Sequence, residues 1–162
     1  MTGVVESIHI GEAGGASMTE IAEAQLVAGR GIVGDRYHGA TGSFSKELPD
    51  PDHELTLIAA EEIDAFNAAT GRSLGHGELR RNIVTRGVDL NALVGKEFTI
   101  GTVKVRGIRL CEPCSYLASL LGPDILPALV HKAGLRSRIL ADGTIRVGDR
   151  LGSSSEPEGV PS

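Results

Sequence analysis

The chain has 162 residues, with 16 basic and 21 acidic side chains and a formal net charge of −5. This length suits a single domain, and an acidic chain with two tyrosines, three phenylalanines and no tryptophan lacks the basic surface and stacking platform of nucleic-acid-binding proteins. The N-terminus has no signal-peptide pattern, and no stretch approaches the ~18 apolar residues of a membrane span. We therefore expect a cytoplasmic protein that binds neither nucleic acid nor membranes.

Two early segments have ambiguous periodicity. Residues 3–10 carry apolar side chains that include Val5 and Ile8, and although their alternation is imperfect, the segment favours a strand. Residues 22–27 are rich in alanine, which favours a helix, but following glycines end the segment quickly. Local propensity leaves this second segment open between helix and strand.

A long polar stretch precedes a clear strand and helix. Residues 38–53 have no hydrophobic period and predict a loop, which is either a functional lid or an ordinary insertion. Residues 55–58 predict a short strand. Apolar residues at helical spacing from Ala59 to Phe66, followed by Gly71, then predict a helix that ends at this glycine.

A hairpin is predicted around the two-residue turn 101–102. It pairs Ile100 with Val103 and Phe98 with Val105, so that all four side chains share one face.

A second hairpin is predicted around the loop 141–143, with its glycine in the left-handed position. It pairs Ile139 with Ile145 and Ser137 with Val147.

Two short helices are expected between these hairpins. One carries leucines from Leu117 to Leu121, and Asp124 can cap another that runs to Gly134. Many short strands, three short helices and 22 glycines predict a mainly β fold with short helices, in the form of a closed or nearly closed β-barrel. Residues 1–152 would form this domain, and the polar residues 153–162 a disordered tail.

The segment Cys111-Glu112-Pro113-Cys114 carries the two cysteines of the chain. Cys114 begins a predicted helix, whose N-terminus favours a thiolate, although a buried, inert cysteine is the alternative. Cys111 is either a spectator or a resolving partner that forms a disulfide with Cys114. A structural zinc site needs more ligands than this pair supplies, and a thioredoxin-like site needs a βαβ pattern.

The run Arg80-Arg81-Asn82 precedes an apolar strand. Strand alternation can direct one arginine into the barrel mouth and the other away. The planar guanidinium suits phosphate or molybdate oxygens. Surface salt bridges made by both arginines are the alternative.

Three further residues in one turn, Asp35, Arg36 and His38, can bind an anion or move a proton, or can simply form the turn. His131 lies near the end of a predicted helix, where a positive charge interacts favourably with the helix dipole. Motifs for nucleotide binding or serine hydrolysis are absent from the sequence.

In order and spacing, these segments resemble the MOSC family, the domain found at the C-terminus of molybdenum cofactor sulfurase, in amidoxime-reducing proteins and in small bacterial proteins. The resemblance runs from Gly3 to about Leu151. Its motifs are Gly34-Asp35-Arg36-Tyr37-His38, Leu55-Thr56-Leu57-Ile58, Arg80-Arg81-Asn82-Ile83, Cys111-Glu112-Pro113-Cys114, His131-Lys132-Ala133-Gly134-Leu135 and Gly148-Asp149. It implies a barrel of the MOSC or pyruvate-kinase-barrel type, with residues 22–27 as a strand.

The resemblance also implies site residues. Cys114 matches the cysteine thought to accept sulfur as a persulfide or to ligate molybdenum, and Arg80 and Asn82 match cofactor-contacting positions. The further candidates for cofactor binding are Arg81, Arg36, Asp35, His38 and His131.

Cofactors and partners follow from the same resemblance. It implies a molybdenum cofactor, and it links the family to pyridoxal phosphate. In the sulfurases pyridoxal phosphate belongs to a separate domain for which 162 residues leave no room, so we expect it only through a partner cysteine desulfurase. A molybdoenzyme is the other expected partner.

Two classes of function remain open. The first is a molybdenum-dependent oxidoreductase or a sulfurtransferase-like sulfur carrier. The second is a non-catalytic module that binds or protects an anionic cofactor, or that captures a thiol-reactive small molecule.

Overall fold

The computed structural model describes residues 3–11, 19–28, 31–33, 55–71, 73–76, 81–111, 132 and 134–153. These residues form two β-sheets with the α-helix α1 (Ala60–Thr70) and the short 3-10 helix η2 (Leu90–Leu93). The strands are β1 (Val4–Ile10), β2 (Thr19–Ile21), β3 (Glu23–Val27), β4 (Gly31–Ile32), β5 (Leu55–Ala59), β6 (Ile83–Arg86), β7 (Glu97–Ile100), β8 (Val103–Leu110), β9 (Leu135–Ile139), β10 (Gly143–Arg146) and β11 (Leu151–Ser153).

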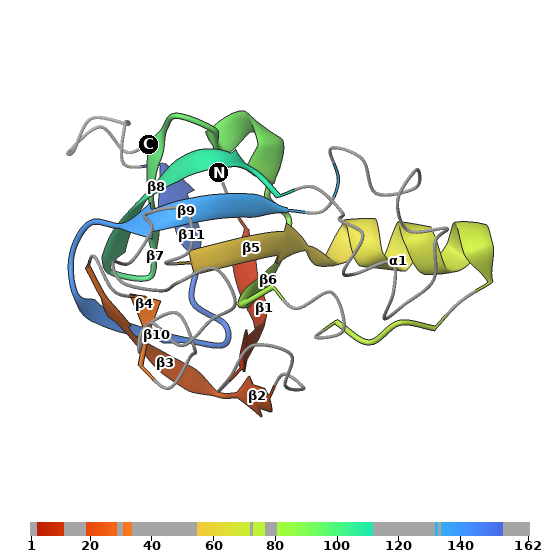
Figure 1. Cartoon of the computed structure of the whole chain (residues 1–162), viewed down its shortest axis with the longest axis horizontal. Coiled ribbons are helices and arrows are strands. Elements are labelled where there is room, and N and C mark those ends of the chain that lie inside the picture. Colours follow the sequence, from red (N-terminus) through yellow and green to blue (C-terminus); the bar gives the residue numbers. More distant parts are fainter. Residues whose placement is uncertain are drawn as a thin grey trace, which may run out of the picture.

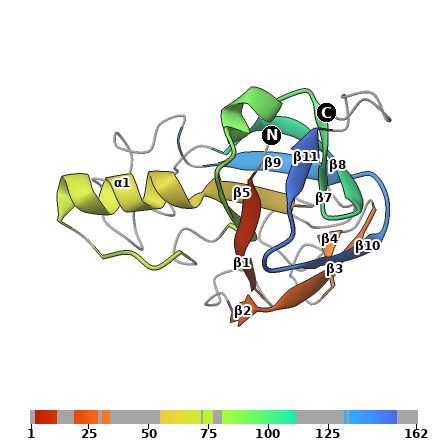
Figure 2. The ribbon, with the colours of Figure 1, turned by 180° about the vertical axis from the view of Figure 1, so that it is seen from behind.

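The larger sheet has eight strands in the order β11-β7-β8-β9-β5-β6-β1-β2, and it curls into a nearly closed barrel (Figure 1). The chain just before β11 returns to β1: Val5 N donates to Asp149 O at 2.8 Å, and a bridge joins Val4 to Arg150. Strand β11 and the start of β1 therefore lie close together at the back of the molecule (Figure 2). The predicted barrel of the mainly β class is confirmed.

The barrel interior is filled by aliphatic side chains and one phenylalanine from the inner faces of the strands. Its largest fully buried members are Ile8, Leu26, Ile32, Leu55, Leu57, Ile83, Phe98 and Ile100. Burial at roughly 25 cal/mol per Å² of apolar surface makes this interior the main source of stability. Polar side chains of the larger sheet are therefore expected on its outer face.

A β-bulge in β1 explains the imperfect alternation of its sequence. Val5 pairs with Thr85 and Ser7 with Val84, so Glu6 is an extra residue on this strand. Val5 and Ile8, three residues apart, can then both face the core. The predicted strand is confirmed as β1. Its bulge leaves the polar residues of the strand on the outer face.

The helix α1 packs on that outer face through a second apolar cluster. Its Ile63 and Phe66 lie in one cluster with Ile58 of β5 and Val84 of β6. Gly71 follows in the left-handed conformation with φ of 74°, and its N–H donates to Asn67 O at 2.9 Å. The predicted helix and its glycine terminus are confirmed, and α1 projects beyond the barrel (Figure 1).

The predicted hairpin at 101–102 is confirmed, with Ile100 opposite Val103 and Phe98 opposite Val105. The strand expected over 22–27 is confirmed as β3.

The hairpin predicted at 141–143 is wrong. Both edges of β9 are occupied, one by β8 and the other by β5, so β10 pairs instead with β3 in the three-stranded sheet β10-β3-β4. Ile145 therefore lies opposite Ala24 rather than Ile139, and Val147 donates to Ala22 O rather than pairing with Ser137. The loop connects two sheets, and Gly143 does not take the left-handed conformation.

Several predicted segments lie outside the described residues: the loop 38–53, both helices between 117 and 133, and the tail beyond residue 153. No helix in the part of the chain that the structure describes is long and apolar enough to cross a membrane.

Candidate functional site

Polar side chains are buried on the outer face of the barrel, around the start of β6. They are Ser7, His9, Thr56 and Asn82, and Arg81, which directly precedes Asn82, is also buried. Burying a polar group is unfavourable unless hydrogen bonds replace those to water. This cluster is therefore a feature that requires its own explanation.

Backbone hydrogen bonds place His9, Asn82 and Thr56 side by side on three neighbouring segments. His9 N donates to Asn82 O at 2.7 Å, and Asn82 N donates to Thr56 O at 3.1 Å. Asn82 thus continues the ladder just before β6 begins at Ile83.

The side chain of Asn82 reinforces the same ladder. Its Oδ1 accepts hydrogen bonds from the backbone N and the Oγ1 of Thr56, both at 3.2 Å, and its Nδ2 donates to His9 O at 3.0 Å. The Thr56 hydroxyl in turn accepts from Asn82 N at 2.9 Å. Asn82 joins β1 to β5 as well as standing at a predicted cofactor-contacting position.

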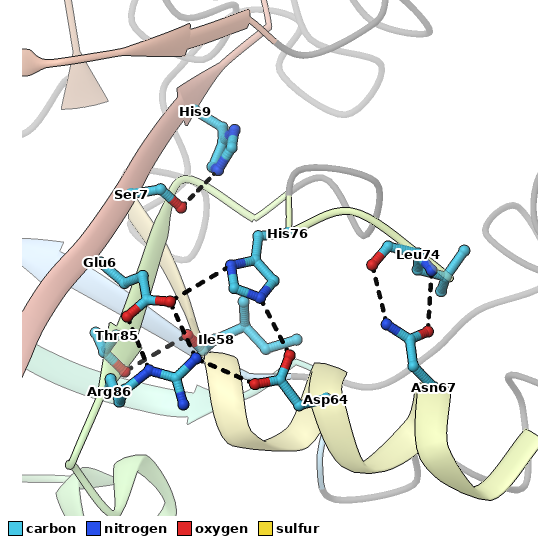
Figure 3. A network of polar contacts seen from close by, with 10 residues as sticks. All are labelled: Glu6, Ser7, His9, Ile58, Asp64, Asn67, Leu74, His76, Thr85 and Arg86. Carbon is cyan, nitrogen blue, oxygen red and sulfur yellow. Dashed lines mark hydrogen bonds and ion pairs between the residues drawn. The ribbon is translucent and has the colours of Figure 1, made fainter. Parts of the chain in front are cut away.

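Ser7 and His9 form a buried hydrogen-bonded pair, with 2.8 Å between Ser7 Oγ and His9 Nε2 (Figure 3). Burial lowers the pKa of His9 below its usual 6.5, and His76 lowers it further, while Glu20 opposes the shift. His9 is therefore neutral at neutral pH. Sequence reasoning missed both residues, although their polarity inside an apolar strand was a readable signal.

A charged network lies next to this pair, between β1, β6 and α1 (Figure 3). Arg86 donates to Glu6 through Nε at 2.8 Å and Nη2 at 3.0 Å, and to Asp64 through Nη2 at 3.1 Å. His76 lies 3.3 Å from Asp64 and 3.9 Å from Glu6. The hydrogen bonds from Arg86 are the main cause that lowers the pKa of both carboxyl groups.

The segment that leads toward Arg81 is fastened to α1 at two points. Asn67 accepts a hydrogen bond from Leu74 N and donates one to Leu74 O, both at 3.0 Å (Figure 3). Two residues later His76 meets Asp64 of the same helix. The helix therefore holds the chain shortly before the arginine motif, and the contacts of Asn82 hold it just after.

The described members of the predicted site are Arg81 and Asn82. Both side chains are buried, with Arg81 8% exposed and Asn82 3% exposed. The remaining candidates, Arg80, Cys114, Asp35, Arg36, His38 and His131, lie outside the described residues.

Cys111 is fully buried in the apolar cluster beneath α1, where its backbone N donates to Gly134 O at 2.8 Å. Its thiol lies among aliphatic and aromatic side chains, which is the environment of an unreactive cysteine.

The residue types around Asn82 are those that can bind an anion, since hydroxyl, amide, imidazole and guanidinium groups can donate to the oxygen atoms of a negatively charged ligand. In this structure the Thr56 hydroxyl and the Asn82 amide already donate to acceptors of the protein. Across the described ranges, no group of three or more histidine, cysteine, aspartate or glutamate side chains could hold a metal ion. These residues fit the anionic part of a cofactor, and a metal would depend on Cys114.

A cavity of about 360 Å³ lies elsewhere, between the start of α1 and the loop after β6. Glu61, Glu62 and Asp89 line it together with Lys132, and Glu61 accepts a hydrogen bond from Gly87 N at 2.7 Å. Its acidic lining does not suit an anion, so we do not place the candidate site there.

Solved structures share this fold. YuaD from Bacillus subtilis superposes with a TM-score of 0.76 at 16% identity, covering 93% of this chain and 94% of that one. YiiM from Geobacillus stearothermophilus gives 0.73 at 20% identity, covering 98% and 77%. YiiM from Escherichia coli gives 0.67 at 18% identity, covering 97% and 71%.

At these identities the structures establish the fold alone. A search of curated protein sequences gives no significant match. The profile of the MOSC domain matches residues 34–152, which is most of the chain and includes the whole arginine and cysteine motifs, and the protein therefore belongs to the MOSC family.

Proposed function

We propose that the protein binds a molybdenum-containing cofactor, or carries sulfur as a persulfide on Cys114, at the outer face where β6 begins. The observation that carries the proposal is the buried cluster around Arg81 and Asn82. A guanidinium in a buried, low-dielectric place makes strong charge-assisted hydrogen bonds to an oxyanion. Membership of the MOSC family adds the association with molybdenum cofactor.

Under this proposal the residues divide into two groups. Arg80, Arg81 and Asn82 hold the anionic part of the ligand, with Asp35, Arg36, His38 and His131 as further contacts, and Cys114 ligates molybdenum. When bound, the metal supplies the electron transfer of an oxidoreductase. His9, neutral and hydrogen-bonded to Ser7, keeps the β1 side of the site free of added charge.

Sulfur transfer would need only a thiolate on Cys114. The thiolate attacks the terminal sulfur of a donor persulfide, the S–S bond of the donor breaks, and the donor leaves as a thiolate while Cys114 becomes a persulfide. A partner cysteine desulfurase, which carries pyridoxal phosphate itself, is the proposed donor, and a molybdoenzyme the proposed acceptor.

A non-catalytic alternative uses the same site. The buried side chains of Arg81 and Asn82 can equally serve a module that binds or protects an anionic cofactor without turnover. A thiol-reactive small molecule captured on Cys114 belongs to the same class.

The deciding experiment is molybdenum analysis by mass spectrometry, with a persulfide assay, on protein expressed with molybdate. Stoichiometric molybdenum that disappears in Cys114→Ser supports the cofactor role, and persulfide without metal supports the sulfur carrier. Cys111→Ala is the matched control, since this thiol is buried away from the polar cluster, and it should retain either signal. A wild type that shows neither molybdenum nor persulfide would contradict the proposal and would favour the binding module.

A further inference from the structure

One ring nitrogen of His9 differs from the other polar atoms of the buried cluster. The Thr56 hydroxyl donates to Asn82 Oδ1 at 3.2 Å, and the Asn82 amide donates to His9 O at 3.0 Å. Ser7 and His9 form the remaining pair, with 2.8 Å between Ser7 Oγ and His9 Nε2. The second ring nitrogen of His9, Nδ1, makes no hydrogen bond within the part of the chain that the structure describes.

The pairing with Ser7 determines which nitrogen carries the proton. Burial lowers the pKa of His9 below 6.5, so the ring is neutral and has one N–H. With the proton on Nε2, two groups would lack partners among the described residues, namely the hydroxyl hydrogen of Ser7 and the bare Nδ1. With the proton on Nδ1, the hydroxyl donates to Nε2 and only the Nδ1–H lacks a partner. Because each buried polar group without a partner is unfavourable, the ring carries its proton on Nδ1.

This Nδ1–H is within reach of a ligand. His9 as a whole is only 5% exposed. Ser137 Oγ is the only fully buried side-chain atom without a partner in the described part of the chain, so the unpartnered Nδ1 keeps some accessible surface. In Figure 3 this nitrogen is on the side of the ring that faces away from Ser7 and from the charged network around Arg86. A nearly buried donor that is accessible at one atom is suited to contact a ligand.

His9 is also the neighbour of Asn82 on the outer face. His9 N donates to Asn82 O at 2.7 Å. The adjacent residues Ile8 and Ile83 pair with each other and face the core. Strand alternation therefore directs the side chains of His9 and Asn82 to the same outer face, with their Cβ atoms about 5 Å apart. An anionic ligand that contacts Asn82 can then also reach His9.

Glu20 is the other group that could accept the Nδ1 proton. It lies directly opposite His9 on β2, and its charge raises the pKa of His9 against the larger effect of burial. Glu20 is exposed, so water competes for its carboxylate. The test therefore includes Glu20→Gln.

We propose that His9 is a further ligand-binding residue, which donates its Nδ1–H to an oxygen atom of the anionic ligand while Ser7 positions the ring. The neutral imidazole adds a hydrogen bond to the ligand without adding a charge. This inference rests on the proposed function, since it adds a contact to the same site, and molybdate is a simple oxyanion with which to probe that contact.

The first measurement is NMR of the imidazole nitrogens in the full chain, with isotope-labelled histidine, at pH 7.5. The His9 ring is assigned by through-bond correlation to its own backbone amide. We expect a protonated Nδ1 and a bare Nε2, and we expect the Nδ1 signal to move saturably when molybdate is added. This readout uses the wild type, so it does not depend on how well any variant folds.

Two replacements of His9 separate the roles of its ring nitrogens. Asparagine places its amide near the position of Nδ1, whereas glutamine places its amide near the position of Nε2. In calorimetric titration with molybdate at constant ionic strength, His9→Asn should keep most of the affinity. His9→Gln should weaken binding by at least about tenfold, the effect of losing one hydrogen bond to a charged group. Gln25→Ala is the control, because Gln25 is exposed on β3 of the other sheet, and it should bind like the wild type.

The positioning role of Ser7 is tested through the tautomer of His9. In Ser7→Ala the Nε2 atom loses its donor, so the ring should populate both tautomers, and the affinity for molybdate should fall less than in His9→Gln. Ser7→Thr restores the hydroxyl and should restore both the Nδ1 proton and the affinity. A serine with a merely structural role would leave the tautomer unchanged when it is replaced by alanine.

Three outcomes would overturn the inference. They are a wild type with a protonated Nε2 and a bare Nδ1, a His9→Gln variant that binds molybdate as tightly as the wild type, and an Nδ1 signal that responds to Glu20→Gln but not to molybdate. Molybdenum that is lost in Cys114→Ser but unaffected by His9→Gln would also overturn it, and would leave the proposed function standing. Molybdate binding that moves the Nδ1 signal, in a protein that retains neither molybdenum nor persulfide, would refute the proposed function and leave the His9 contact standing.

Discussion

Replacing Asn82 by alanine separates a structural role from a ligand-binding role. Among the described residues the side chain makes at least three hydrogen bonds, two from Thr56 to Oδ1 at 3.2 Å and one from Nδ2 to His9 O at 3.0 Å. With 3% of its surface exposed, water cannot easily replace them. Alanine would leave the Thr56 donors and the His9 carbonyl to find other partners.

The cost follows from these contacts. A hydrogen bond contributes a net of about 0.5–1.5 kcal/mol, and a buried group left without a partner costs more. Three bonds together therefore predict a loss of about 2–4 kcal/mol in the free energy of unfolding. With a urea m-value of about 1–3 kcal/mol per M, the midpoint should fall by roughly 1 M or more.

The assay is urea unfolding followed by far-UV circular dichroism, since the chain contains no tryptophan. Gln25→Ala is the control, because Gln25 is exposed on β3, and its effect should stay within about 0.5 kcal/mol. An unchanged midpoint in Asn82→Ala, together with loss of ligand, would refute the structural reasoning and assign Asn82 to the ligand alone.

Four other predictions concern single side chains. Ser137→Ala should leave the thermal midpoint unchanged or raise it, because the buried Oγ has no hydrogen-bond partner among the described residues. Gly134→Ala should lower the free energy of unfolding, measured in urea, by at least about 2 kcal/mol, because its φ is 115° and a Cβ would lie 2.0 Å from Leu57 O. The pKa of His9 is lowered from 6.5, so the unfolded chain binds the proton more readily and stability should fall as pH drops below about 6.5; His9→Gln should flatten this slope in urea titrations at pH 7.5 and 5.5. Arg86→Gln should flatten the loss of stability below about pH 4.5, since its two carboxylate partners have pKa values lowered from 4.5 and 3.8 and their contribution is present only above that range; an unchanged acid transition would contradict the network.

Short sequence patterns predicted the elements that depend only on neighbouring residues, namely helix α1 and the hairpin at 101–102. Helix α1 follows from apolar residues at helical spacing and from Gly71, which can adopt φ of 74° and so end the helix. The hairpin at 101–102 follows from a two-residue turn between alternating apolar residues, and the observed register pairs Phe98 with Val105. In both cases a few neighbouring residues are enough to explain why the element forms where it does.

The prediction of a hairpin at 141–143 was wrong because strand pairing there depends on residues that are distant in the sequence. The loop 141–143 contains residues that suit a turn. However, β9 pairs with β5 along one edge and with β8 along the other, and both of these strands come from other parts of the chain. Asp142 instead accepts a hydrogen bond from Ala28 N at 2.8 Å, which fastens the loop to the second sheet. Competition for strand edges overrides a turn signal.

The site was only partly predictable for the same reason. The arginine motif was visible in the sequence, and the structure buries both Arg81 and Asn82. The network of Glu6 with Arg86 depends on contacts between segments 80 residues apart, and no spacing rule within one strand predicts it. Ser7 and His9, by contrast, are two residues apart on β1, so their pairing had a local signal in the sequence.

Two bulges determine which polar residues share the outer face. In β1 the extra residue Glu6 lets Val5 and Ile8 both face the core, which leaves the polar residues between and beyond them outside. In β8 the extra residue Ile108 brings a second arginine to the outer face. Strict alternation would have sent one member of each set to the wrong side, and bulges are common next to functional sites. In β1 and in β8 a single inserted residue, rather than the strict alternation of polar and apolar residues, determines which polar side chains lie on the outer face of the larger sheet.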